Sequence, residues 1–82
     1  MNKRIGTITI IITNRTAQAG AVNTILGEYG DAVIGRMGLP YPAKGLHIIA
    51  LIVHASTDVI GALTGKLGAL TGVEVKSALT RV

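Results

Sequence analysis

The sequence repeats itself at an offset of 41 residues, which is half of its length of 82 residues. The matched positions include apolar residues and glycines: Ile8 with Ile49, Gly20 with Gly61, and Leu26 with Leu67. Each half contains an apolar run, a segment with helical periodicity and a shorter apolar run. Two βαβ units in series predict an α+β, ferredoxin-like βαββαβ fold, with a four-stranded antiparallel sheet and two helices on one face. We expect residues 1–82 to form a single domain.

The repeat divides into six predicted elements. The predicted strands are residues 4–13, 32–39, 46–55 and 73–80. The first helix is expected to run from a cap at Asn14 or Thr16 to about Tyr29, where Gly30 stops it, and the second from a cap at Ser56 to Gly72. Its predicted buried stripe contains Val59, Ile60, Leu63, Leu67 and Leu70. Residues 39–45 contain both prolines, so we predict a hinge there without regular strand pairing.

The two faces of the predicted sheet differ in what covers them. Strand alternation places the more apolar set, which includes Ile8, Ile10, Ile49 and Leu51, beneath the helices. The other set leaves an apolar patch that no helix covers: Ile5, Ile11, Leu46, Ile48 and Ile52. Monomers rarely expose such a patch, and burying one such side chain contributes about 1.5–3 kcal/mol. We therefore predict that this face is the interface of a homo-oligomer, either a dimer or a tetramer.

Four glycines fall on the predicted outer surface of the helices: Gly20, Gly27, Gly61 and Gly68. A glycine within a helix costs about 1 kcal/mol relative to alanine. Two interpretations stay open. The surface is under little selection, or a further subunit packs closely against a smooth strip.

The composition limits the classes of partner. Apolar residues make up 49% of the chain and charged residues 15%, and there is no cysteine, which excludes disulfides and thiolate metal sites. The net charge of +4 comes from scattered cations, and Tyr29 and Tyr41 are the only aromatic residues. The sequence thus lacks a stacking platform for single strands and any DNA-binding motif. Direct DNA binding through the basic surface stays open as a third hypothesis.

The first residues resemble a signal peptide, since Lys3 and Arg4 precede an isoleucine-rich stretch. However, residues 5–13 align with residues 46–54 of the repeat, so a strand is the better interpretation. The longest apolar run, residues 46–55, is much shorter than the roughly 20 residues that span a bilayer. We expect no membrane association and a cytoplasmic location.

No residue pattern indicates catalysis. His47 and His54 are seven residues apart and should point to opposite faces of one strand, so one chain cannot bind a metal with both. A site made by His54 from two chains is geometrically allowed. The acids are unpaired and no nucleophile or phosphate-loop motif occurs. We predict no catalytic residue, no metal, no cofactor and no enzymatic activity.

Five residues are candidates for binding a small effector: Asn14, Arg15, Thr16, Arg36 and His54. The first three follow a predicted strand and open a helix, where free amides suit a small anion or amino acid. Ordinary helix capping is the alternative for these three. Arg36 stands at the end of the second strand, beside the prolines.

Three segments carry a resemblance to a known family: Ile12–Arg15, Gly35–Tyr41 and Leu46–Ala55. The chain resembles the small iron-only hydrogenase system regulators, which are similar to ACT domains and to the C-terminal domain of the nickel-responsive repressor. The resemblance implies a ferredoxin-like fold, an oligomer joined through its sheets and an effector site at a subunit interface. The chain lacks the repressor's cysteine, and Asn14-Arg15-Thr16-Ala17 replaces the aspartate and proline–glycine step of many ACT domains.

Two functions from different classes follow. The leading hypothesis is a non-enzymatic, oligomeric regulatory domain that binds a small effector between subunits. The resemblance implies a transcriptional or metabolic regulator of the iron-only hydrogenase system type. The alternative is a structural or protein-interaction module that pairs through its sheet face with another chain.

Overall fold

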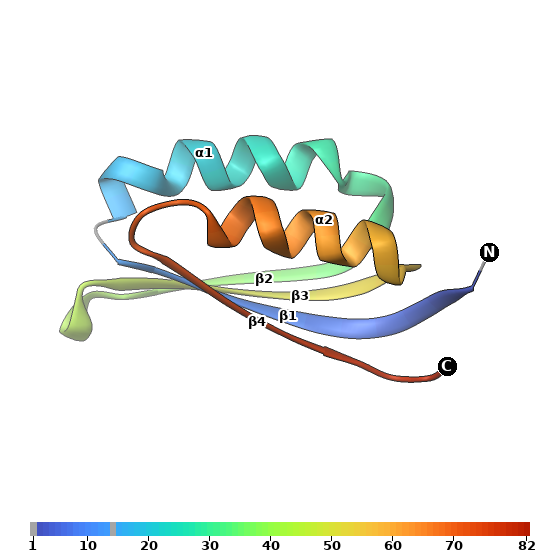
Figure 1. The fold of residues 1–82 in the computed structure, drawn as a ribbon. Helices are drawn as coiled ribbons and strands as arrows, with labels where there is room; N and C mark the ends of the chain where they lie inside the picture. Colours follow the sequence, from blue (N-terminus) through green and yellow to red (C-terminus); the bar gives the residue numbers. More distant parts are fainter. Residues whose placement is uncertain (1, 14) are drawn as a thin grey trace.

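The computed structural model describes the backbone of residues 2–13 and 15–82 and the side chains of residues 2–13 and 18–82. The elements follow the predicted order (Figure 1). They are β1 (Lys3–Thr13), α1 (Arg15–Glu28), the 3-10 helix η1 (Gly30–Ala32), β2 (Val33–Tyr41), the 3-10 helix η2 (Pro42–Lys44), β3 (Leu46–Ser56), α2 (Thr57–Gly68) and β4 (Val73–Leu79).

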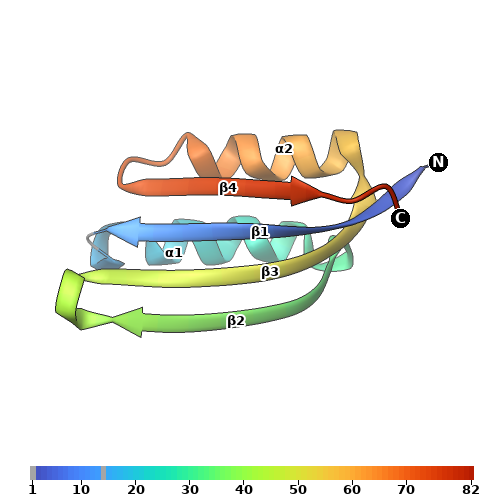
Figure 2. The ribbon, with the colours of Figure 1, turned by 90° about the horizontal axis from the view of Figure 1, so that it is seen from below.

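The four strands form one antiparallel sheet in the order β2-β3-β1-β4 (Figure 2). Both helices lie side by side on one face of it, which makes two layers (Figure 1). This confirms the predicted ferredoxin-like fold.

The core lies between the helices and the sheet. In β1 the residues Ile8, Ile10 and Ile12 are at most 1% exposed. Their partners on β3 and the inward residues of the helices complete the core: Ile49, Leu51, Val53, Val22, Leu26, Ile60, Leu63 and Leu67. Strand alternation therefore predicted the buried face correctly.

Two predictions about the helices need correction. Val59 is 38% exposed, because Ile60, about 100° further round α2, takes the inward position. The first helix ends at Glu28, close to its predicted end, whereas α2 ends at Gly68 and not at Gly72, which adopts a φ of 79° in the turn before β4. The predicted Ser56 cap is confirmed, since its Oγ accepts a hydrogen bond from the Val59 amide at 3.2 Å.

The predicted hinge at residues 39–45 is wrong in its first part. Pro40 lies within β2 and pairs with His47, and its neighbours Leu39 and Tyr41 pair with Ile48 and Leu46. Because β2 is at the edge of the sheet, it has a partner on one side only, and a missing amide hydrogen there is tolerated. The chain turns later, in η2, where Gly45 adopts a φ of 66°.

Candidate functional site

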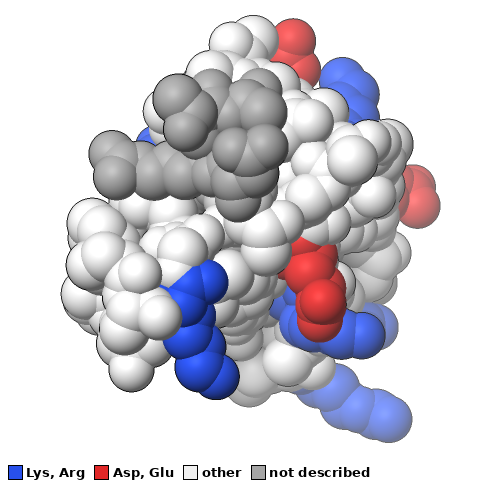
Figure 3. All heavy atoms as spheres, turned by 90° about the vertical axis from the view of Figure 1, so that its left-hand side faces the viewer, with Lys and Arg blue, Asp and Glu red and all other residues white. Residues whose placement is uncertain are grey.

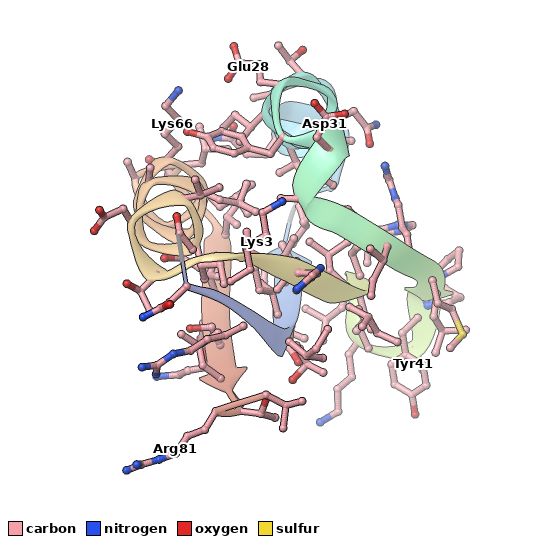
Figure 4. All side chains as sticks on the ribbon, turned by 90° about the vertical axis from the view of Figure 1, so that its right-hand side faces the viewer. Lys3, Glu28, Asp31, Tyr41, Lys66 and Arg81 are labelled. Carbon is pink, nitrogen blue, oxygen red and sulfur yellow. The ribbon has the colours of Figure 1, made fainter. Side chains whose placement is uncertain are left out.

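The face of the sheet that points away from the helices carries exposed apolar side chains. They concentrate on β2 and β3, where Met37 is 68% exposed, Leu39 53%, Ile52 47% and Tyr41 44%. Figure 4 shows Tyr41 on the side of the sheet opposite the helices. We call this surface the open face.

The five residues predicted for an interface lie on the open face. Ile11 pairs with Ile48, and Leu46 pairs with Thr13, which places these side chains beside one another. Ile52 is exposed, whereas the other four are partly buried by their neighbours: Ile5, Ile11, Leu46 and Ile48. The prediction missed Met37 and Leu39, which lie in the predicted second strand, because alternation assigned faces only to the first and third strands. It missed Tyr41 because that residue fell in the predicted hinge. Self-association itself stays a prediction.

The open face is hollowed at its centre. Gly35 on β2 and Ala50 on β3 leave a cavity of about 320 Å³ between the larger side chains of Met37 and Ile52. On β4 the open face carries Glu74 and Lys76, which lie opposite Ile11 and Thr9 of β1. The face therefore combines an apolar half with a polar half that holds both signs of charge.

A second feature lies on the helix side of the sheet, where α1 leaves part of β2 uncovered. Arg36 of β2 reaches across to α1, and its Nη2 donates a hydrogen bond to Asn23 Oδ1 at 2.8 Å. Both residues line two adjoining cavities, of about 320 Å³ and 130 Å³. We call the two together the α1/β2 groove.

The two compartments of the groove have different walls. The larger is lined by Leu26, Gly27, Gly30, Val33 and Leu51 besides Asn23 and Arg36. The smaller is lined by Ile12, Ala19, His47 and Ile49 besides the same two residues. Apolar core residues thus form the floor, and Arg36 and Asn23 stand between the compartments.

His47 has an unusual environment in the smaller compartment. Its Nδ1 is buried and has no hydrogen-bond partner among the described residues. Its Nε2 lies beside Gly38, 3.4 Å from the position that a Cβ there would occupy. The absence of a side chain at Gly38 makes room for the imidazole.

The structure does not bring the predicted effector residues into one site within a chain. Asn14, and the side chains of Arg15 and Thr16, lie outside the described residues. Arg36 lies on the helix side of the sheet, since it pairs with buried Leu51, whereas exposed His54 lies on the open face. Their roles in binding stay predictions. Sequence reasoning missed Asn23, whose contact with Arg36 depends on how α1 packs.

The two histidines point to opposite faces, as predicted: His47 lies opposite buried Ile12 and His54 opposite Ile5. Within the described part of the chain, no group of three or more histidine, cysteine, aspartate or glutamate residues lies close enough to hold a metal.

Charged side chains are dispersed on the surface that Figure 3 shows. On the outside of the helices, Lys66 Nζ lies 3.5 Å from Glu28 Oε1 and 5.2 Å from the centre of the Tyr29 ring (Figure 4). A hydrogen bond to Tyr29, and then attraction to Tyr29 and Glu28, raises the pKa of Lys66. This cluster joins the end of α1 to α2 at the surface, where the side chains of Lys66 and Glu28 are about half exposed.

The fold, with two helices on one face of a β2-β3-β1-β4 sheet, defines a ferredoxin-like domain of the ACT-like kind. Residues 4–77 match the TM1266-like family model, described as "Iron-only hydrogenase system regulator, putative". The chain belongs to this family, as the resemblance predicted. No curated protein matches the chain in sequence.

Solved structures agree with this assignment. The uncharacterized protein TM1266 from Thermotoga maritima is 35% identical, with a TM-score of 0.91 over 94% of this chain and 96% of that one. The ACT domain from GTP pyrophosphokinase of Chlorobium tepidum is 17% identical, with a TM-score of 0.75 over 95% and 89% of the two chains. The nitrogen regulatory PII-like protein CPII from Thiomonas intermedia K12, solved with ADP, AMP and bicarbonate, is 18% identical, with a TM-score of 0.52 over 94% and 92%.

No helix in the described residues has the length and apolar character needed to cross a membrane.

Proposed function

We propose that residues 1–82 form a single non-enzymatic regulatory domain that acts in the cytoplasm. It self-associates through the open face and binds a small effector in the α1/β2 groove. Effector binding regulates by favouring one assembly state over another, which requires different affinities for the two states.

The observation that carries the self-association is the exposed apolar surface of β2 and β3. Met37 is 68% exposed and Ile52 47%, on a face that no helix among the described residues covers (Figure 2). Contiguous apolar patches of this kind mark interaction sites in soluble proteins. A second copy is the favoured occupant, because Glu74 and Lys76 on the same face allow charge pairing in a two-fold arrangement.

The groove and the relatives support effector binding. The larger compartment, of about 320 Å³, is within the size range of small-molecule sites. The chain belongs to a regulator family, and a PII-like regulatory protein with a similar fold was solved with ADP, AMP and bicarbonate. We place the effector of this chain beside Arg36, with Asn23 as a second polar contact.

Sedimentation equilibrium at micromolar concentrations tests the assembly. We expect the mass of a dimer or tetramer for the natural sequence and a monomer for Ile52→Lys, because a lysine at the centre of the patch would be buried without a partner. Val59→Lys is the control, since Val59 is also apolar and 38% exposed but lies on the helix layer. A natural chain that stays monomeric would contradict self-association and would favour pairing with a different protein.

A further inference from the structure

Arg36 has hydrogen-bonding capacity that the chain itself does not use. A guanidinium carries five N–H donors, and the structure gives Arg36 one partner, the neutral amide of Asn23. Among the residues that the structure describes, no carboxylate lies within ion-pair distance of Arg36. The hydrogen bond to Asn23 holds the exposed Arg36 side chain across a groove with an apolar floor. A positioned cation of this kind suits a planar or tetrahedral oxyanion, which it can bind with two parallel hydrogen bonds.

His47 adds a second donor in the smaller compartment. Because Nδ1 is buried without an acceptor, a hydrogen on Nδ1 would be a buried unpaired donor. The neutral tautomer with its hydrogen on Nε2 avoids this. The remaining donor, Nε2–H, then lies beside Gly38, and His47 lines the smaller compartment together with Arg36.

The sizes of the two compartments indicate how a ligand would be divided between them. The smaller, of about 130 Å³, holds a group such as a carboxylate or phosphate, since the share of one water in the liquid is about 30 Å³. The larger, of about 320 Å³, offers Leu26 and Val33 to an apolar body, and glycines at positions 27 and 30 that leave room for it.

We propose that the effector is a small carboxylate- or phosphate-bearing molecule. Its oxyanion binds between Arg36 and His47, and its body lies in the larger compartment against Leu26 and Val33. This inference rests on the effector-binding part of the proposed function and names the chemistry of the ligand. Asn23 positions the guanidinium and is released or shared when the oxyanion binds.

The test uses inorganic phosphate and acetate as probes, each titrated at constant ionic strength with sodium chloride as the balancing salt. Phosphate binding is followed by the ³¹P line width, and acetate binding by saturation transfer to its methyl group. We expect saturable binding of at least one probe, and Arg36→Gln should weaken it by about tenfold or more, because the paired charge is lost. Arg36→Lys should recover part of the affinity, since it keeps the charge without the planar donor pair.

Lys44→Gln is the matched control, since it removes an equal charge from η2, outside the groove. It should change probe affinity by less than about twofold.

Binding of phosphate alone identifies a phosphorylated ligand, of acetate alone a carboxylate, and of both a general oxyanion site. The inference is overturned if neither probe binds, if Arg36→Gln binds as well as the natural chain, or if Lys44→Gln weakens binding equally. Sedimentation of the same samples distinguishes failure of the ligand proposal from failure of the proposed assembly. A stable oligomer that binds neither probe would contradict the proposed ligand chemistry and leave the proposed self-association standing.

Discussion

The two halves of the repeat pack differently against the two edges of the sheet. In the second half, α2 buries Ile60, Leu63 and Leu67 to 2% exposure or less. In the first half, Ala19 stands at the position of Ile60 and contributes a short wall to the groove. Because alanine is smaller than isoleucine, the space between α1 and β2 stays open beside Ala19. The larger side chain of Ile60 is packed into the core.

The polar residues at matched positions of the two halves also differ in their contacts. At the offset of 41, Asn23 matches Thr64 and Arg36 matches Ser77. Thr64 bonds only within its own helix, to the carbonyls of Ile60 and Gly61, whereas Asn23 holds Arg36 across the groove. Both βαβ units contribute apolar residues to the core, and the first also carries a polar pair beside the groove.

Two glycines of the sheet, both in the first half, also differ in what surrounds them. A Cβ at Gly6 would lie 2.5 Å from Leu79 Cδ2 and 2.8 Å from the Ala78 carbonyl oxygen. A Cβ at Gly38 would lie 3.4 Å from His47 Nε2 and meet no backbone. Leu79 and a backbone carbonyl fill the space beside Gly6, whereas the end of one histidine side chain fills the space beside Gly38.

The largest expected effect comes from giving the second half the small residue of the first. Ile60→Ala should lower the free energy of unfolding by about 2–5 kcal/mol, because Ile60 is 2% exposed and its loss leaves a cavity. Urea unfolding measures this change. Val59→Ala, at a 38% exposed neighbour, should lose less than about 1 kcal/mol. Equal losses at both positions would contradict the close packing of Ile60 in the core.

The two glycines should respond differently to a methyl group. Gly6→Ala should destabilise the protein by about 1–3 kcal/mol, since a backbone carbonyl and Leu79 must both move. Gly38→Ala should change stability by less than about 0.5 kcal/mol, because only the end of one side chain is near. Thermal unfolding of both variants checks the pair, and a larger loss for Gly38→Ala would reverse the proposed contrast.

The sequence was sufficient to predict the element order, the helix side of the sheet and the buried face, because all three follow from the repeat and from strand alternation. The length of β2 was missed, since the effect of Pro40 depends on whether its strand is at an edge. Edge position is a property of the sheet order and not of the local sequence.

The groove could be predicted only in part. Arg36 was a candidate, but Asn23 gave no local signal, because its role depends on the distance between α1 and β2. A comparison of the halves at the offset of 41 offers the missing signal: Ala19 for Ile60 and Arg36 for Ser77 are the replacements that open and charge the groove.

Closing the groove should separate binding from stability. Ala19→Ile copies the second half and fills the smaller compartment, so we expect probe affinity to fall by about tenfold while stability changes by less than about 1 kcal/mol. Gly20→Ala is the control, since nothing lies within 4 Å of its would-be Cβ. It should stabilise the helix by about 0.5–1 kcal/mol and leave probe affinity unchanged. Full binding by Ala19→Ile would place the ligand elsewhere.

The smallest effect should come from the cluster that joins the two helices. Because the pKa of Lys66 is raised, its stabilising contribution is present below the ordinary value of 10.5 and is lost as the pH rises through the raised value. Lys66→Met should therefore lower the melting temperature slightly at pH 7, and the difference should vanish at strongly alkaline pH. A difference that is independent of pH would assign the effect to packing on Tyr29 instead of charge.

The proposed difference between the two halves, a ligand groove beside α1 and β2 and none at the corresponding residues, is tested most directly by amide chemical shifts. These are recorded on ¹⁵N-labelled protein during titration with phosphate and with acetate. We predict saturable shifts at residues that surround the groove: Asn23, Gly27 and Arg36 of the first half, and His47 of β3. The counterparts of the first three in the second half, Thr64, Gly68 and Ser77, should stay unchanged. Shifts of equal size at those counterparts, or shifts that follow the dispersed lysines and arginines, would contradict a site in the groove.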